Sequence, residues 1–308
     1  MNCLVTGGAG FIGSHLVEKL LDSGHSVRVL DNLTSGSLDN LTGSIDHIEF
    51  VQGDLRNSAD THRAVQGIDT IFHLAAYISV ADSMLNPAEC FDVNVTGTNL
   101  LLQTAHQNGV KKVVISSSAA VYGDQKDLPI HENAALHPLS PYGASKQMDE
   151  ILADLYTRSF TLPVVCLRYF NVYGPRQNPN SPYAAAIPLF IRQMLDHYPV
   201  TIYGDGGQTR DFVYVKDIAS ANLLAATCPA ADGKIINICG GKPVSILELV
   251  NTLHGIIPEA PPHQFSFARA GDIYHSYGCP DLAAEILSFE PAIPFQNGLA
   301  ETIKWMRM

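Results

Sequence analysis

Two side chains that lie four residues apart, Tyr142 and Lys146, could carry acid–base chemistry. A tyrosine hydroxyl is a poor base at neutral pH because its reference pKa is about 10. An ammonium about 4 Å away, at an effective dielectric constant near 20, favours the phenolate by about 4 kcal/mol, which is worth roughly three pH units. The spacing therefore predicts a tyrosine that acts as a general base, with the hydroxyl of Ser118 orienting a substrate oxygen.

A strand and a helix must position these groups. The apolar run 113–115 predicts a buried strand, so Ser116–Ser118 stand at its C-terminal end, where open α/β sheets bind ligands. Pro141 suits the first turn of a helix on which Tyr142 and Lys146 share one face. Because any tyrosine and lysine can lie four residues apart by chance, the rest of the sequence must show whether this pair has a catalytic role.

Composition narrows the class of protein. The chain has 308 residues, 46% of them apolar, which suits one large or two modest globular domains. A net charge of −11 argues against a nucleic-acid-binding surface. The sequence contains no run of 18 apolar residues, and it enters a strand by Cys3 without a signal peptide, so we expect a cytoplasmic protein that does not contact a membrane. The six cysteines form no C-x-x-C pair and predict reduced thiols without a metal: Cys3, Cys90, Cys166, Cys228, Cys239 and Cys279.

The N-terminal region carries a dinucleotide-binding pattern. A short strand ends in a glycine-rich turn from Gly7 to Gly13, a helix follows, and the next strand stops at Asp31. Glycines let the backbone approach a pyrophosphate at the positive end of the helix, and a carboxylate 18 residues beyond Gly13 can accept both ribose hydroxyls. Asp31 would repel a 2′-phosphate, which favours NAD over NADP.

Strands and helices continue to alternate, which predicts an α/β fold with a Rossmann-like, doubly wound parallel sheet and a smaller α/β substrate-binding lobe. We place the NAD-binding domain and the Ser/Tyr/Lys group in residues 1–170, and mainly the substrate lobe in 171–308, where the chain could cross back to the sheet. Asp54 could accept the adenine amino group or be a solvated acid. Asn94 lies among apolar neighbours in a helix that runs to Gly109, so it needs a buried partner.

The lobe contains groups that could hold a diphosphate and a ribose. Two arginines and an amide, Arg210, Arg269 and Asn171, could clamp the diphosphate, and Asp272 could accept the ribose. Each arginine alone could equally form a surface ion pair.

With these motifs in place, the chain resembles, over essentially its whole length, the extended short-chain dehydrogenase/reductase family. It is most similar to the NAD-dependent nucleotide-sugar 4-epimerases of the UDP-glucose/UDP-N-acetylglucosamine type. The resemblance rests on the turn T-G-G-A-G-F-I-G at 6–13, the pair Tyr142-x-x-x-Lys146, the serines 116–118, the run 168–175 and R-x-G-D at 269–272. The G-x-x-G-x-x-G spacing is the one that this family uses.

The resemblance implies roles for individual residues. The cofactor site would contain Gly7, Gly10, Phe11, Ile12 and Gly13 on the pyrophosphate, Asp31 and Asn32 on the ribose, Asp54 and Leu55 on the adenine, Leu74, Ala75, Ala76, Asn94, Ser116 and Phe170 along the rest, and Tyr142 and Lys146 near the nicotinamide. The substrate site would contain Ser118, Asn171, Tyr203 beside the uracil, Arg210, Arg269, Asp272 and Ser276. It also implies tightly bound, recycled NAD and a homodimer formed through a four-helix interface.

The implied reaction is 4-epimerisation of a UDP-sugar through a transient 4-keto intermediate. Related dehydratases carry an Asp-Glu pair directly after the position of Ser118, where this chain has Ala119 and Ala120, and decarboxylases carry a glutamate in this region that is absent here. Serine at position 276 leaves room for an N-acetyl group, and the segment 178–185 resembles that of epimerases accepting such sugars. We therefore expect UDP-GlcNAc/UDP-GalNAc, UDP-glucose/UDP-galactose or both as substrates.

Alternatives remain open. A UDP-glucuronate 4-epimerase would need one cationic donor that the sequence does not place, and another nucleotide-sugar oxidoreductase would release NADH. A non-catalytic NAD-binding sensor is disfavoured because Ser118, Tyr142 and Lys146 are all present.

Overall fold

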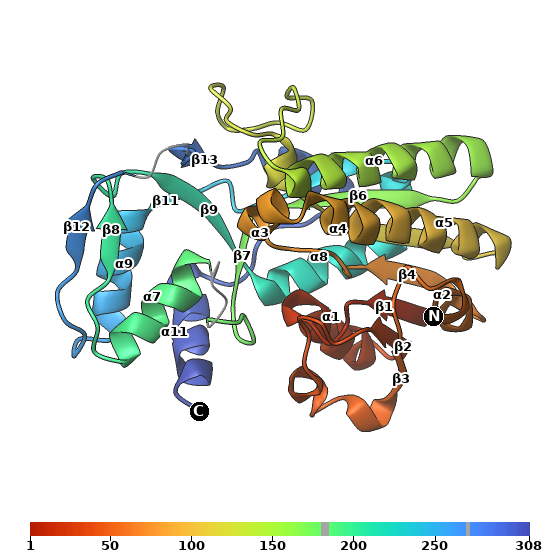
Figure 1. Ribbon diagram of the computed structural model, residues 1–308, viewed down its shortest axis with the longest axis horizontal. Coiled ribbons are helices and arrows are strands. Elements are labelled where there is room, and N and C mark those ends of the chain that lie inside the picture. The colour runs from red at the N-terminus through yellow and green to blue at the C-terminus, as the bar shows by residue number, and fades with distance from the viewer. Residues whose placement is uncertain (180–184, 269–271) are drawn as a thin grey trace.

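The computed structural model describes residues 1–179, 185–268 and 272–308 (Figure 1). Its largest element is a seven-stranded sheet in the order β10-β6-β5-β4-β1-β2-β3, and every strand pair in it is parallel. The strands are β1 (Asn2–Thr6), β2 (Ser26–Asp31), β3 (Ile48–Gln52), β4 (Thr70–His73), β5 (Lys112–Ser118), β6 (Val164–Tyr169) and β10 (Ile235–Ile238). The order reverses between β1 and β4, which makes their carboxyl ends the place where such sheets bind ligands.

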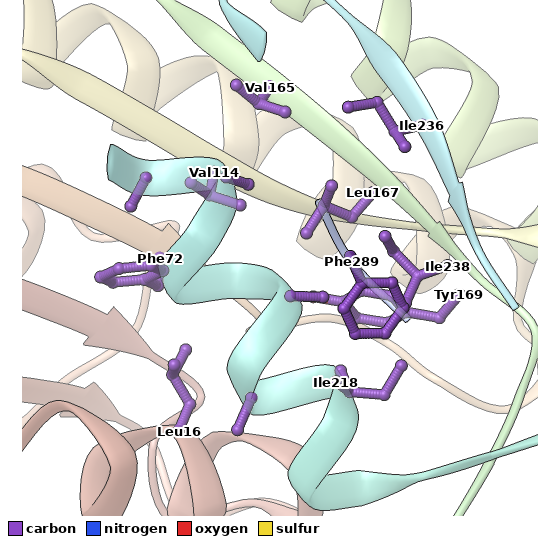
Figure 2. Packing of buried hydrophobic residues seen from close by; sticks show 14 of the residues in the cluster. Leu16, Phe72, Val114, Val165, Leu167, Tyr169, Ile218, Ile236, Ile238 and Phe289 are labelled. Atoms are coloured by element: carbon purple, nitrogen blue, oxygen red, sulfur yellow. The ribbon is translucent and has the colours of Figure 1, made fainter. Parts of the chain in front are cut away.

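Helices cover both faces of the sheet. One face carries α1 (Phe11–Asp22), α8 (Val215–Thr227) and α10 (Asp281–Leu287), and the other carries α2 (Ser58–Val65), α5 (Gly97–Gln107) and α6 (Pro141–Phe160). Figure 2 shows α8 on the first face, with Phe72, Val114 and Leu167 of the strands packed around the helix. Because both faces are covered, the strands read as apolar runs rather than as alternating patterns, and this is why the sequence reveals them.

A smaller lobe, at the left of Figure 1, follows the sheet. Its helices are α7 (Ala186–Leu195), α9 (Ile246–Ile256) and α11 (Phe295–Met306), and its strands are β7 (Asn171–Tyr173), β8 (Thr201–Tyr203), β9 (Thr209–Tyr214), β11 (Pro243–Ser245), β12 (Gln264–Ser266) and β13 (His275–Ser276). β9 pairs with β7, β11 and β13, and the three helices share a core with Val200 and Ile202. The chain beyond residue 171 also supplies β10, α8 and α10 to the sheet, so it builds parts of both regions.

Short elements connect these parts. They are α3 (Val80–Leu85), α4 (Pro87–Phe91), a π-helical turn at Asp92–Thr96, and single 3₁₀ turns at Leu38–Leu41, Ile45–His47, Ala119–Val121 and Pro229–Ala231. The sequence predicts one helix from Asn94 to Gly109, whereas the α-helix begins at Gly97 and the π-helical turn precedes it. The wider turn carries Asn94, whose side chain is buried and fully used, as described below.

The described residues contain no helix that is long and apolar enough to cross a membrane. All six cysteines are free, and five of them are buried. No group of three or more His, Cys, Asp or Glu in the described ranges could hold a metal ion.

Candidate active site

The glycine turn after β1 packs tightly against the end of β4. Gly7 has φ +70°, and a Cβ there would lie 2.7 Å from the backbone nitrogen of Ala75. A Cβ on Gly13 would lie 2.2 Å from the carbonyl oxygen of Gly7. Among the described residues, a Cβ on Gly10 would meet only that same carbonyl oxygen, at 3.1 Å. Gly7 and Gly13 are therefore required by the close packing of the turn, whereas Gly10 leaves space in front of α1.

This space suits a dinucleotide. Gly10 is the N-cap of α1 and has no side chain to cap it, so the first-turn N–H groups of the helix face the space with no intrahelical partner. Asp31 ends β2 beside the turn, where its carboxylate accepts hydrogen bonds from Ala9 N at 2.9 Å and Leu33 N at 2.8 Å. Burial raises the pKa of this carboxyl. A carboxylate oxygen accepts more than one hydrogen bond, so Asp31 retains capacity for ribose hydroxyls while it fixes the turn.

The residues expected at the adenine form a charged cluster. Both oxygens of Asp54 accept from the Arg56 guanidinium, at 2.9 and 2.8 Å, and Asn32 Nδ2 donates to Asp54 Oδ2 at 3.0 Å. The Arg56 hydrogen bonds hold the pKa of Asp54 well below its usual range, so the group is an ionised acceptor. Arg56 also pairs with Glu89 and Asp92. Arg56 is not among the residues predicted from the sequence, although an arginine two residues after an acid is a signal for this pair. Leu55 is buried.

The remaining residues expected along the cofactor lie near the ends of β4, β5 and β6. Leu74, Ala75 and Ala76 directly follow β4, and Ser116 Oγ donates to the carbonyl of His73 at 3.0 Å. Phe170, directly after β6, is buried, and its ring lies 6.4 Å from that of Tyr122.

Asn94 has the buried partners that the sequence predicts for it. Its Nδ2 donates to Ser145 Oγ at 2.8 Å, and its Oδ1 accepts from Tyr77 N at 2.7 Å. Ser145 lies on α6 between Tyr142 and Lys146, so Asn94 fixes the helix that carries both of them. This contact confirms the expectation of a buried partner.

The helix α6 brings Tyr142 to the end of β5. It begins at Pro141 with Ser140 as N-cap, whose Oγ accepts from Gly143 N at 3.1 Å. Its first turn packs against the 3₁₀ turn that follows Ser118, so closely that a Cβ on Gly143 would lie 2.6 Å from the carbonyl oxygen of Ala120. Ser118 Oγ in turn accepts from Ala120 N at 3.2 Å. Ser118 and Tyr142 thus come from two segments in direct contact.

Lys146 lies one helical turn after Tyr142 on α6, and its side chain is only 2% exposed. Its Nζ lies 3.3 Å from Asp149 Oδ2, and Asp149 is fully buried. Burial opposes the charge on Lys146, but Asp149 and Tyr142 outweigh it and raise the pKa of the ammonium. The chain therefore keeps a charged lysine beside the tyrosine. Asp149 is not among the residues predicted from the sequence, although an acid three residues after Lys146 on a helix is a recognisable ion-pair spacing.

The residues expected to hold UDP gather mainly on β9 and its neighbours. Arg210 of β9 pairs in register with Ser276 of β13, and Asn171 of β7 pairs with Phe212 of β9. Burial lowers the pKa of Arg210, whose charge Asp272 favours. Tyr203 belongs to β8, which pairs with β12 in a separate sheet. Arg269 and most of the segment 178–185 lie outside the described residues.

The parallel sheet and the glycine turn with its facing acid define a dinucleotide-binding enzyme fold, and Ser118, Tyr142 and Lys146 lie at the carboxyl end of its sheet. The chain belongs to the NAD dependent epimerase/dehydratase family, whose model matches residues 3–239.

Its relatives cover nearly the whole chain. It is 37% identical over 311 residues to the UDP-glucose 4-epimerase of Mycolicibacterium smegmatis, which covers 100% of this chain and 99% of that protein. The UDP-N-acetylglucosamine 4-epimerase of Methanobrevibacter ruminantium, solved with UDP-N-acetylmuramic acid, superposes with a TM-score of 0.95 at 39% identity, covering 99% of this chain and 98% of that one. The UDP-glucose 4-epimerase of Thermotoga maritima, solved with UDP-glucose, gives 0.94 at 37% identity, with coverages of 100% and 99%.

Proposed function

We propose that this protein catalyses the NAD-dependent 4-epimerisation of a UDP-sugar through a transient 4-keto intermediate, and that it accepts UDP-GlcNAc/UDP-GalNAc at least as well as UDP-glucose/UDP-galactose. The observation that supports this proposal is the contact between the first turn of α6, which carries Tyr142, and the turn after β5, which follows Ser118, together with the buried ammonium of Lys146. The similar chains named above are UDP-glucose and UDP-N-acetylglucosamine 4-epimerases.

NAD, when bound, supplies a hydride acceptor for carbon 4 of the sugar and a donor that restores the carbon–hydrogen bond. The glycine turn, the open N-terminus of α1 and Asp31 would hold it. Lys146 would contact its ribose and stabilise the phenolate of Tyr142.

Tyr142 takes the proton of the sugar 4-hydroxyl and later returns a proton to the 4-oxygen, while Ser118 orients that oxygen. The keto carbon is planar, so rotation of the sugar about the diphosphate presents its opposite face and inverts the centre. Such a rotation needs a firm hold on UDP, for which Arg210, Asn171 and Asp272 are the candidates, and a loose hold on the sugar. Ala119 and Ala120 carry no acid or base, so elimination of water from the keto sugar has no catalyst at these positions.

The preference for N-acetylated sugars rests on Ser276. Its pairing with Arg210 places it next to a residue proposed to bind the diphosphate, and its small side chain leaves room for an acetamido group. UDP-glucuronate is the alternative substrate, because a carboxylate needs only one suitable donor.

The reaction is tested by incubating the purified protein with UDP-GlcNAc, UDP-glucose or UDP-glucuronate, without added NAD, and reading products by proton NMR. We expect the 4-epimer of at least one neutral sugar, and the fastest substrate identifies the sugar class. No conversion of any of the three after addition of NAD would contradict the proposal. Stoichiometric release of NADH would instead identify a net oxidoreductase.

A homodimer and a cytoplasmic location complete the proposal. Three apolar side chains on α6, at spacings of three and four residues, are 41 to 61% exposed: Met148, Ile151 and Leu155. α5 packs beside α6, with Tyr156 Oη and Asn99 Oδ1 3.3 Å apart, so two copies of this helix pair could form a four-helix interface. Free, mostly buried thiols fit a reducing compartment.

A further inference from the structure

A second carboxylate is enclosed directly behind the proposed catalytic group. Asp149 is fully buried, and its Oδ2 lies 3.3 Å from Lys146 Nζ. Its other oxygen, Oδ1, has no hydrogen-bond partner among the described residues. Asp149 plays no part in the mechanism proposed above.

Glu150, the residue next to Asp149, is a buried carboxylate whose hydrogen bonds differ from those of Asp149. Glu150 accepts from Arg168 Nε at 2.8 Å and from Arg168 Nη2 at 2.7 Å, and Ser117 Oγ donates to it at 2.6 Å. Both of its oxygens are therefore used. Burial of an incompletely bonded carboxylate is costly, so the state of Asp149 calls for a cause other than anchoring the fold.

A chain of polar groups leads to Asp149 from the centre of the sheet. Thr6 Oγ1 lies 2.8 Å from His73 Nδ1, and His73 Nε2 lies 2.8 Å from Thr98 Oγ1. Burial lowers the pKa of His73 to about 3, so its ring is neutral and one nitrogen donates while the other accepts. Thr98, on α5, lowers the pKa of the Asp149 carboxyl, but its hydroxyl does not satisfy Oδ1.

We propose that Asp149 is a positioning residue that fixes the Lys146 ammonium and balances its charge, and thereby sets the pH range in which Tyr142 acts as a base. The proposal rests on the function proposed above. The Asp149 carboxylate lies behind the ammonium and offsets part of its attraction for the phenolate of Tyr142, so an ammonium without this carboxylate would attract the phenolate more strongly.

The titratable groups that influence Asp149 come from every neighbouring element. They are Lys146 and Glu150 on α6, Cys166 on β6, Cys90 on α4 and, through Lys146 and Thr98, His73 on β4. Burial raises the pKa of Asp149, and the Lys146 charge opposes that rise, so Asp149 and Lys146 together determine the charge behind Tyr142.

The test compares the wild type with Asp149→Asn, which removes the charge and keeps the shape. We expect the acidic limb of the kcat–pH profile for the best UDP-sugar to move about one to two units to lower pH, the size expected for one charge roughly 8 to 12 Å from the phenolate at an effective dielectric constant near 20. A readout without substrate is the ultraviolet titration of tyrosinate, with the Tyr142→Phe background subtracted, and it should shift in the same direction. Asp149→Glu restores the charge and should keep the wild-type limb.

The outcomes separate the two proposals. An unchanged tyrosinate titration and an unchanged kcat–pH profile in Asp149→Asn would overturn the role of Asp149, even if the midpoint of thermal unfolding fell. A shift in Asp149→Glu as large as that in Asp149→Asn would also overturn it. If the wild type epimerises no UDP-sugar, the proposed function fails, and the tyrosinate titration still decides whether Asp149 controls Tyr142.

Discussion

Gly143, in the first turn of α6, lies against the carbonyl of Ala120, in the turn after β5, so closely that a Cβ would come within 2.6 Å of the oxygen. Substitution Gly143→Ala must push the two segments apart, and with them Tyr142 and Ser118. We expect kcat to fall about 10- to 100-fold, because displacements of about 1 Å have effects of that size. The matched control is Gly255→Ala in α9, where a Cβ would meet nothing within 4 Å, and it should keep full activity. Equal kcat values for both variants would contradict the expected contact.

Removal of the proposed base should affect turnover and not binding. Tyr142→Phe keeps the ring but loses the hydroxyl, so we expect kcat to fall by about 10²- to 10⁴-fold. UDP affinity, measured by calorimetry, should stay within about twofold, because no UDP contact is proposed for Tyr142. Tyr198→Phe, at a 65% exposed tyrosine, is the control and should match the wild type.

The buried histidine at the centre of the sheet predicts loss of stability in acid. Burial lowers the pKa of His73 to about 3, below its unfolded value of 6.5, so between these pH values the unfolded state binds a proton that the folded state does not. The free energy of unfolding should therefore fall as pH falls through this window, by about 1.4 kcal/mol per unit for this group. Denaturant titrations from pH 7 to 4.5 should show a shallower slope for His73→Gln than for the wild type. An equal slope would show that another group is responsible.

Sugar choice should respond to one residue of β13. Ser276→Tyr would fill the space proposed for an acetamido group, and we expect turnover of UDP-GlcNAc to fall about tenfold or more while that of UDP-glucose is retained. Ser276→Ala should accept both. The test is to measure kcat/KM for UDP-GlcNAc and for UDP-glucose with each variant. An unchanged kcat/KM for UDP-GlcNAc in Ser276→Tyr would remove the basis for this substrate assignment.

The apolar stripe on α6 predicts an interface. Ile151 is 61% exposed, and Ile151→Glu would place a charge in the centre of the proposed four-helix contact. We expect sedimentation equilibrium to show a dimer for the wild type and for Lys304→Glu on α11, and a monomer for Ile151→Glu. A wild-type monomer at micromolar concentration would argue against the interface.

The features that the sequence predicted correctly are local ones. The buried strands are short apolar runs, and the helix that starts at Pro141 has its own cap signals, so the placement of Tyr142 and Lys146 on one helix needed no tertiary information. The i, i+3 spacing of Lys146 and Asp149 is also local, but the approach of Thr98 to Asp149 depends on how α5 and α6 meet, which no single stretch of sequence specifies. The π-helical turn at Asp92–Thr96 escaped prediction for the same reason, because its apolar spacing reads as an ordinary helix.

Strand β10 is synthesised long after β6, the strand with which it pairs, and this order has a consequence for biosynthesis. This strand pairs with β6 at the edge of the sheet, yet it lies at Ile235–Ile238, more than sixty residues after β6 ends at Tyr169. While the ribosome makes the intervening chain, β6 is an unprotected edge with free N–H and C=O groups, the kind of surface that pairs with other chains. The nascent protein is therefore most vulnerable to aggregation after β6 has been synthesised and before β10 is complete. A chaperone that binds during this period would protect the exposed edge of β6.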